Sequence, residues 1–329
     1  MAESSRQPAG VEPDWILECD DLAASIGETE VLSSLALRLP RGQSLGIVGE
    51  TGSGKSIACR TMIGLLGRVG GRISRGSLRF DGSDVTHASE DEWRRLRGRK
   101  IAFVPQASLS GLDPIMTVGR QLMETIRVLT DHGHPRTRAV ELLELVDMPR
   151  PDRVMRSYPH ELSGGMRQRA MIALAVAGDP ALLIADEPTT ALDVTVQKLV
   201  LELLVSLVKT KSMSLILVTH DLAVVQEHTD STAIMYAGET VEVGRTDTVL
   251  SGDGHPYTRA LLASGPARMR AGQRLGVIGG SPPSPTEWPP GCRFAPRCAY
   301  ATDECRIAKP ARVSERSIRC LRLLEIRNG

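Results

Sequence analysis

The stretch that most constrains the fold is GETGSGKS, Gly49 to Ser56 of this 329-residue chain. It follows SLGIV, an apolar run with the composition of a buried strand, and it precedes a run with the period of a helix. A glycine-rich loop between a strand and a helix is the context of a phosphate-binding loop, or P-loop. The sequence therefore predicts an α/β fold that binds a nucleotide.

The chemistry of a P-loop explains its composition. Its glycines let backbone N–H groups turn inward as an anion nest, and the positive end of the following helix adds to the field. Lys55 is expected to reach the β- and γ-phosphates, and the Ser56 hydroxyl to ligate Mg²⁺. The residues expected to bind ATP in this loop are Gly49, Glu50, Thr51, Gly52, Ser53, Gly54, Lys55, Ser56 and Ile57.

Short apolar runs alternate with helical segments along most of the chain, which indicates a parallel sheet covered by helices. A long stretch at about 107–179 interrupts this alternation and predicts a helical subdomain. After residue 265 the composition shifts to Pro, Gly and Arg, as in a linker. We therefore expect a disordered lead-in at 1–13, a nucleotide-binding domain at 14–265, and a Pro- and Cys-rich C-terminal extension at 266–329.

Two acidic residues end a second apolar run, LLIADEP. Asp186 is expected at the carboxyl end of a buried strand, where it can hold Mg²⁺ through water. Glu187 is expected to face the water that attacks ATP. A solvated turn or a helix cap is the alternative for such a pair, and the P-loop in the same chain argues against it.

A second anion-binding helix start is predicted at LSGGMRQR. Ser163 can cap this helix, and Gly164 and Gly165 leave backbone N–H groups open to an anion. Because one ATP needs only one P-loop, this second surface is best used on a nucleotide held by another subunit.

Together these motifs resemble those of the ATP-binding subunits of ABC transporters, over roughly residues 15–264. GETGSGKS resembles the family's Walker A motif, LSGGM its signature, and LLIADE its Walker B motif. Gln106 then corresponds to the Q-loop glutamine, Asp193 to the D-loop aspartate, and His220 to the switch histidine. The implied fold is a P-loop NTPase of α/β class, with a mixed sheet core, a helical subdomain and a small Cys-rich extension.

The resemblance also implies how ATP is handled. Two subunits would pair head to tail, each ATP lying between the Walker A of one subunit and the signature of the other. Glu187 and His220 would be catalytic, and ATP would close the dimer. Mg²⁺ would be held by Ser56, Gln106 and Asp186, and Gln106 would also contribute to ATP binding. The residues that would contact the partner's ATP are Ser163, Gly164, Gly165, Met166 and Asp193.

Three positions depart from the family pattern. Ile26 stands where the family usually has an aromatic residue that stacks on adenine, so the stacking contribution is lost. Met166 replaces the more common glutamine of the signature, although the open amides remain. Ala107 replaces an acidic residue after Gln106, on the surface at 107–130 that would receive a permease.

The stretch from PHELSGGMRQR to TTALDVTVQ, with GHPYTRALL and the cysteines that follow it, is similar to the peptide and nickel import group of ABC ATPases. This implies a paralogous ATPase as partner, two permease subunits, and a substrate-binding protein acting indirectly, at the cytoplasmic face of the membrane. A homodimer of this chain is the alternative to pairing with a paralogous subunit. Dipeptides, oligopeptides, nickel chelates and glutathione are all compatible substrates.

Composition limits the rival classes. Lys and Arg total 40 against 39 Asp and Glu, so bulk attraction to nucleic acid or anionic lipid is not expected. Aromatic residues make up 3%, too few for a base-stacking platform. A non-transport ABC ATPase acting on DNA or ribosomes is the rival function, but the second cassette or long coiled-coil insertion usual there is missing. A further alternative function is an ATPase that serves a redox centre, but the LSGGM signature argues against it.

Four cysteines lie in the extension with spacing C-x5-C-x6-C-x14-C: Cys292, Cys298, Cys305 and Cys320. Zinc ribbons usually use C-x2-C pairs, whereas wider gaps suit the corners of a cuboidal cluster. A [4Fe-4S] cluster is therefore the favoured occupant, with zinc or plain reduced cysteines as alternatives. The peptide-import resemblance implies the same occupant. Cys19 and Cys59 fall outside this set, and Cys59 is expected to be a small buried hydrophobe.

Overall fold

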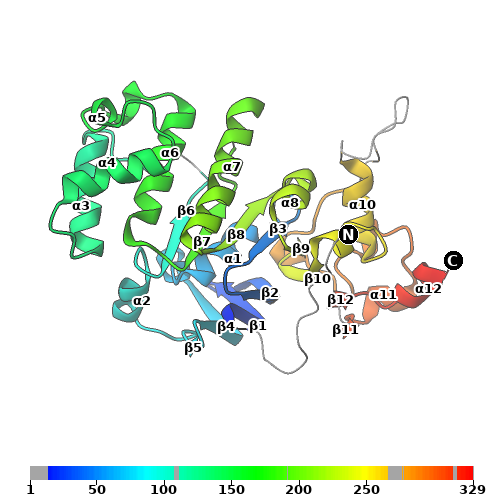
Figure 1. Ribbon diagram of the computed structural model, residues 1–329. Helices are drawn as coiled ribbons and strands as arrows, with labels where there is room; N and C mark the ends of the chain where they lie inside the picture. Colours follow the sequence, from blue (N-terminus) through cyan, green and yellow to red (C-terminus); the bar gives the residue numbers. More distant parts are fainter. Residues whose placement is uncertain are drawn as a thin grey trace.

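A ten-stranded sheet flanked by helices dominates the computed structural model (Figure 1). The structure describes residues 14–106, 111–190, 192–265, 276, 278–313 and 317–328. The predicted lead-in at 1–13 lies outside this part of the chain, as does Ala107.

The strands run across the sheet in the order β5-β4-β1-β2-β10-β9-β3-β8-β7-β6. β1, β2 and β4 pair antiparallel, whereas β3, β6, β7 and β8 pair in parallel, so the predicted mixed α/β sheet is confirmed. The bounds are β1 Trp15–Ile26, β2 Thr29–Pro40, β3 Ser44–Val48, β4 Gly71–Phe80, β5 Ser83–Asp84, β6 Ile101–Val104, β7 Leu182–Asp186, β8 Ser214–Thr219, β9 Ser231–Tyr236 and β10 Glu239–Arg245.

The central strands β3, β7 and β8 are buried along their whole length. Their sequences are continuous apolar runs without alternation, as expected for parallel strands covered on both faces. Because β3 pairs with β8 and β8 with β7, their carboxyl ends meet at one edge of the sheet. β6 joins the same edge beside β7. The loops that follow these strands therefore lie close together at this edge of the sheet.

Helices connect these strands. α1 (Lys55–Met62) follows β3, α7 (Val194–Lys211) follows β7, and α8 (Leu222–His228) follows β8. α2 (Glu90–Leu96) precedes β6 and begins with a capping box, in which Ser89 and Glu92 bond each other's backbone N–H groups. Among the described helices, none is long and apolar enough to cross a membrane.

The predicted helical stretch forms a separate lobe beside the sheet (Figure 1). It contains α3 (Val118–Leu129), α4 (Pro135–Leu145), α5 (Pro151–Val154) and α6 (Gly164–Ala175), with 3-10 turns η2 (Pro159–Glu161) and η3 (Val176–Gly178). Leu122 and Ile126 of α3 are buried, and they belong to the same hydrophobic cluster as Leu183 and Leu217 of the sheet. The lobe is thus packed onto the core.

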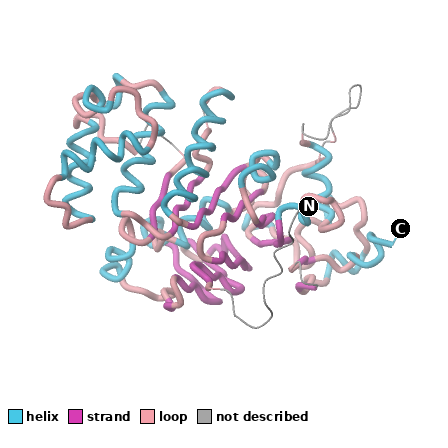
Figure 2. Tube along the Cα trace, in the orientation of Figure 1, coloured by secondary structure: helices cyan, strands magenta, loops and turns pink. Residues whose placement is uncertain are grey.

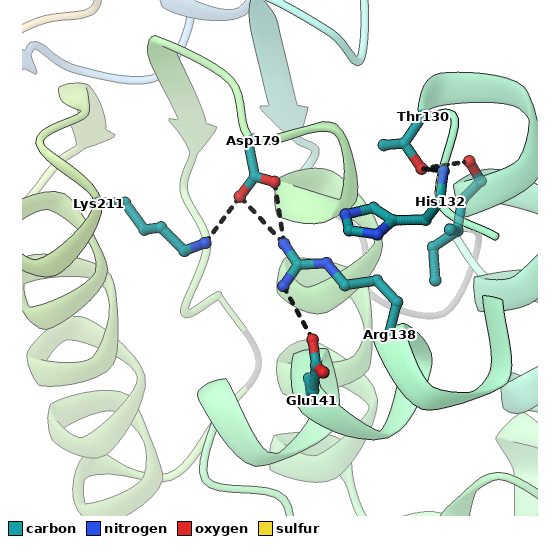
Figure 3. Close-up of polar contacts among 7 residues, drawn as sticks. Thr130, His132, Arg138, Glu141, Asp179 and Lys211 are labelled. Atoms are coloured by element: carbon teal, nitrogen blue, oxygen red, sulfur yellow. Dashed lines mark hydrogen bonds and ion pairs between the residues drawn. The ribbon is translucent and has the colours of Figure 1, made fainter. Parts of the chain in front are cut away.

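An ionic network also ties this lobe to the core at Asp179 (Figure 3). Arg138 of α4 donates to both Asp179 oxygens at 3.0 and 3.1 Å, and Lys211 at the end of α7 donates at 2.7 Å. Arg138 also reaches Glu141 at 3.3 Å. Asp179 follows η3 in the left-handed conformation, and its carboxylate lies between the two cations.

The C-terminal part contains α9 (Thr246–Val249), α10 (Pro256–Ser264), η5 (Pro285–Glu287), η6 (Ala295–Arg297), α11 (Asp303–Ile307), the β11 (Arg312–Val313) and β12 (Ile318–Arg319) ribbon, and α12 (Leu323–Asn328). Loops join these short elements (Figure 2). Phe294 packs in one hydrophobic cluster with Tyr236 of β9 and Tyr257 of α10. Residues on both sides of the predicted boundary near 265 therefore share a core.

Candidate nucleotide site

The P-loop has the backbone that its glycines require. Gly52 and Gly54 adopt left-handed φ angles of 83° and 101°. A side-chain carbon at Gly49 would lie 2.2 Å from the carbonyl oxygen of Met235, so only glycine fits there. α1 begins at Lys55 without a side-chain cap. The first N–H groups of α1 are thereby left for an anion.

Lys55 points into this loop. Its side chain is buried, and Nζ donates to the carbonyl oxygens of Gly49 at 2.8 Å and Glu50 at 3.1 Å. Nζ also lies 3.8 Å from Oε1 of Glu187. Burial lowers the pKa of Lys55, and the carboxylates of Glu187 and Asp186 oppose that shift. The lysine is therefore a desolvated cation placed between the P-loop and the end of β7.

Glu187 is the centre at which the predicted motifs meet. Its Oε2 accepts from Gln106 Nε2 at 3.0 Å and from Thr190 Oγ1 at 3.1 Å, and His220 Nδ1 lies 3.7 Å away. Glu187 has a left-handed φ of 45°, and its N–H donates to the carbonyl oxygen of Val218 at 2.9 Å. This turn directs the carboxylate away from β7 toward the P-loop lysine and the histidine.

Asp186 occupies the end of β7, beside the P-loop serine. It is 5% exposed, and one carboxyl oxygen has no hydrogen-bond partner in the described structure. Burial raises the pKa of Asp186, while the Ser56 hydroxyl lowers it through a hydrogen bond. A buried carboxylate with an unpartnered oxygen next to a hydroxyl is a donor set that suits Mg²⁺.

The signature and D-loop form a second site. Ser163 caps α6 and accepts from the N–H of Met166 at 3.3 Å, while Asp193 caps α7 and accepts from Val196 at 3.0 Å. A side-chain carbon at Gly165 would lie 2.6 Å from Val196, so the two helix starts touch. In the described parts of the chain, no hydrogen bond or ion pair links the signature segment to the P-loop.

Two of the three departures have a structural counterpart. Met166 packs against the hydrophobic cluster of the helical lobe, so its side chain serves the core. Ile26 ends β1 and packs against the cluster under the P-loop helix. Both positions therefore use aliphatic contacts where the family pattern has a polar or aromatic side chain.

Sequence reasoning missed three contributors to the site. Thr190 bonds Glu187, Tyr257 Oη accepts from the N–H of Glu50 at 2.9 Å, and Arg297 donates to both Glu50 oxygens at 2.7 and 2.9 Å. Tyr257 lies in GHPYTRALL and Arg297 next to Cys298, two stretches that the sequence singles out for other reasons. The contacts of Tyr257 and Arg297 join Glu50 to distant parts of the sequence, which no local pattern signals, whereas Thr190 lies three residues after Glu187.

The four extension cysteines are free thiols that line one small pocket of about 20 Å³. Burial raises the pKa of Cys292 to about 12, and burial also raises the pKa of Cys298 and Cys320. The described residues hold no group of three or more His, Cys, Asp or Glu side chains that could bind a metal ion. The predicted cluster and its zinc alternative are therefore not confirmed. Cys59 is fully buried, as expected.

Comparison with known proteins places these motifs in a family. Residues 32–190 match the model described as "ABC transporter", and residues 241–305 match "Oligopeptide/dipeptide transporter, C-terminal region". The oligopeptide transport ATP-binding protein AppD of Bacillus subtilis is 43% identical over 86% of this chain and 87% of its own. The dipeptide transport ATP-binding protein DppD of Escherichia coli is 42% identical over 90% of this chain and 92% of its own.

A solved structure supports the fold. The ATP-binding cassette MJ0796, in a dimeric post-hydrolysis state bound to ADP and Pi, superposes with a TM-score of 0.62 at 26% identity. The match covers 70% of this chain and 98% of that one.

Proposed function

The chain belongs to the ABC transporter family of ATP-binding subunits, in the group of the oligopeptide and dipeptide transport proteins, and on this premise we propose that it hydrolyses ATP to drive import of di- or oligopeptides through a membrane permease. The observation that carries the ATPase role is the convergence of Lys55, Gln106 and His220 on Glu187. The substrate class rests on the relatives' names.

ATP would bind with its phosphates over the start of α1. The open N–H groups of the P-loop and helix favour the anion, and Lys55 adds a desolvated positive charge. Ile26 would contact the base by dispersion alone, so we expect weak discrimination between ATP and GTP.

Mg²⁺ would be held by the Ser56 hydroxyl, the Asp186 carboxylate and the Gln106 side chain. The unpartnered Asp186 oxygen and its Ser56 neighbour fit such an ion. When bound, Mg²⁺ neutralises charge on the β- and γ-phosphates.

Glu187 would act as the base that orients and deprotonates the attacking water. Its carboxylate is held by Gln106 and Thr190, which fixes its direction. His220 is 70% exposed at its side chain and stands on the open side of Glu187, where it would contact the γ-phosphate.

The signature would complete the site of a second subunit. Ser163, Gly164 and Gly165 form a capped helix start, and Asp193 caps the neighbouring helix. We propose that this surface, with Met166, faces the ATP of a paralogous ATPase subunit in a head-to-tail pair. Closure would then require the γ-phosphate.

The permease would dock on the surface at 107–130, of which residues 111–130 are described. Ile115 is 82% exposed and Val128 is 68% exposed there. Such exposed apolar side chains suit a helix of a membrane partner. The chain would thereby work at the cytoplasmic face of the membrane, alongside two permeases and a substrate-binding protein.

Stimulation of ATPase activity tests the substrate class. The chain is purified with its permeases in lipid vesicles, and ATPase activity is measured with binding protein loaded with a dipeptide, a longer peptide, a nickel chelate or glutathione. We expect stimulation by a peptide. If only the nickel chelate or glutathione stimulated the ATPase activity, the proposed peptide substrate would be wrong. Recovery of the chain with ribosomes or DNA instead of permeases would contradict the transport role.

For the extension we propose a [4Fe-4S] cluster held by Cys292, Cys298, Cys305 and Cys320. Four thiols from separate segments line one pocket, and thiolates are the usual cluster ligands. A bound cluster would cross-link the extension. Protein purified without oxygen should absorb near 400 nm and contain iron and sulfide, whereas a colourless protein with stoichiometric zinc would contradict the proposal.

A further inference from the structure

The cysteine-bearing extension reaches the P-loop through one ion pair. Arg297 Nη1 and Nη2 donate to the two carboxylate oxygens of Glu50, at 2.7 and 2.9 Å. The Arg297 side chain is only 5% exposed. The Glu50 side chain is 27% exposed. A two-point bond between a guanidinium and a carboxylate is among the stronger polar contacts in proteins. It joins residues 247 positions apart in the sequence.

The guanidinium is fixed from every side. Its Nε donates to the carbonyl oxygen of Gly279 at 2.8 Å, Nη2 reaches that of Ile278 at 3.3 Å, and Nη1 reaches the Tyr236 hydroxyl at 3.3 Å. The Arg297 side chain is thus held in one orientation by hydrogen bonds to the end of β9 and to the extension. A fixed donor transmits its position to its acceptor, Glu50.

Glu50 is held through its backbone as well. Its N–H donates to the Tyr257 hydroxyl at 2.9 Å, and its carbonyl oxygen accepts from Lys55 Nζ at 3.1 Å. Side chain and backbone of this P-loop residue are therefore both bonded, the side chain by the extension and the backbone by α10 and the P-loop lysine. The conformation of the loop at its second residue depends on all three.

A separate contact supports the same connection. The N–H of Gly238, in the turn between β9 and β10, donates to the carbonyl oxygen of P-loop residue Ser53 at 2.9 Å. Arg293 of the extension bonds the carbonyl oxygen of Ala237 in that turn, and Trp288 packs on it so closely that a side-chain carbon at Gly238 would lie 2.7 Å from the ring. The extension thus contacts the P-loop directly at Glu50 and indirectly at Ser53, through the turn between β9 and β10.

We propose that Arg297 is a positioning residue for ATP binding, which acts through Glu50 to hold the P-loop in its phosphate-binding shape. The proposal rests on the nucleotide site described above. A loop that is ordered before binding loses less entropy when it closes on a phosphate. Arg297 directly precedes Cys298, which lines the cysteine pocket. A movement of the residues that line this pocket would therefore also move Arg297.

Nucleotide affinity tests this role on the full chain. The variants are Arg297→Gln, Arg297→Lys and Glu50→Gln, each with Arg319→Gln as matched control. Arg319 also joins the extension to the domain, by a 3.1 Å ion pair to Asp21, but within the described residues it makes no hydrogen bond or ion pair with the P-loop. Binding of Mg²⁺ with a slowly hydrolysed ATP analogue is measured by calorimetry, and folding is checked by thermal unfolding.

We expect Arg297→Gln and Glu50→Gln each to raise the Kd on the order of tenfold, and their combination to be no worse than either alone. Arg297→Lys keeps the positive charge but cannot form the two-point bond of a guanidinium, so it should bind nucleotide more tightly than Arg297→Gln and less tightly than the wild type. In the assembled transporter the KM for ATP should rise with kcat nearly unchanged.

Wild-type affinity in a folded Arg297→Gln protein, or an equal loss in Arg319→Gln, would overturn the inference. If the wild-type chain bound no nucleotide, the proposed ATPase function itself would fail.

Discussion

Gln106 Nε2 donates a 3.0 Å hydrogen bond to Glu187 Oε2, although the two residues follow different strands. β6 and β7 lie side by side in parallel, so the loops at their carboxyl ends share one space. The residue proposed to help hold Mg²⁺ is thereby bonded to the residue proposed to activate water.

Replacement of the proposed base should separate binding from hydrolysis. Glu187→Gln keeps the size and accepts the same hydrogen bonds but cannot take a proton, so we expect kcat for ATP to fall by about 10² to 10⁴. The Kd for ATP should stay within about threefold. Single-turnover hydrolysis measures the first quantity and calorimetry the second. Glu124→Gln, an exposed carboxylate on α3, serves as control, and retained hydrolysis in Glu187→Gln would remove this residue from the chemistry.

A negative charge introduced into the signature segment should lower ATPase activity in the assembled transporter without weakening ATP binding by the isolated chain. Gly164→Asp places a carboxylate at the start of α6, which the helix itself tolerates but which repels a γ-phosphate brought by the partner. ATPase activity of the assembled transporter should fall at least about 100-fold, a loss typical for a phosphate-stabilising group. ATP binding by the isolated chain should not change. Gly133→Asp, at an exposed position with open space, is the control, and equal effects of the two would contradict the trans role.

Asp186→Asn should stabilise the protein while it abolishes activity. Burial raises the pKa of Asp186, so its ionised form costs folding free energy at neutral pH, where the unfolded chain carries a solvated carboxylate. Without metal or nucleotide, at pH 7.5, the variant should be more stable on the order of 1 kcal/mol. Urea unfolding with a chelator present measures the change. A loss of stability would show that the buried carboxylate serves the fold.

An exposed apolar side chain on the helical lobe should matter for coupling. Ile115→Asp should cut peptide-stimulated ATPase activity about tenfold or more, because a charge on an apolar contact surface opposes docking. Basal ATPase activity of the isolated chain should stay the same. Ile307→Asp is the control, at a position on α11 that is 75% exposed. Unchanged stimulation in the Ile115 variant would place the permease elsewhere.

Much of this arrangement is predictable because the motifs are local. The P-loop needs left-handed glycines and a following helix within a few residues, and Gly52, Gly54 and α1 supply both. Asp186 and Glu187 end a continuous apolar strand, and parallel pairing of β3 with β8 and of β8 with β7 then brings them to the same edge of the sheet as the P-loop. Periodicity and turn chemistry carry this information.

The remainder depends on contacts between distant segments. Nothing near Arg297 indicates that its guanidinium bonds the P-loop at Glu50, since the pairing arises from how the extension packs on β9 and α10. Cysteine spacing likewise indicates a shared site without fixing its size or occupant. Met166 is partly buried against the hydrophobic cluster of the lobe, a packing contact that the motif alone does not show.

The most direct measurement of the central claim is ATP-dependent uptake of a labelled peptide into vesicles that contain the permeases and binding protein. With the wild-type chain, the account predicts accumulation that requires ATP and Mg²⁺, and with Glu187→Gln it predicts none although the complex assembles. Peptide accumulation that continues with Glu187→Gln, or an assembled wild-type complex that hydrolyses ATP without moving peptide, would contradict the claim that this chain powers peptide import.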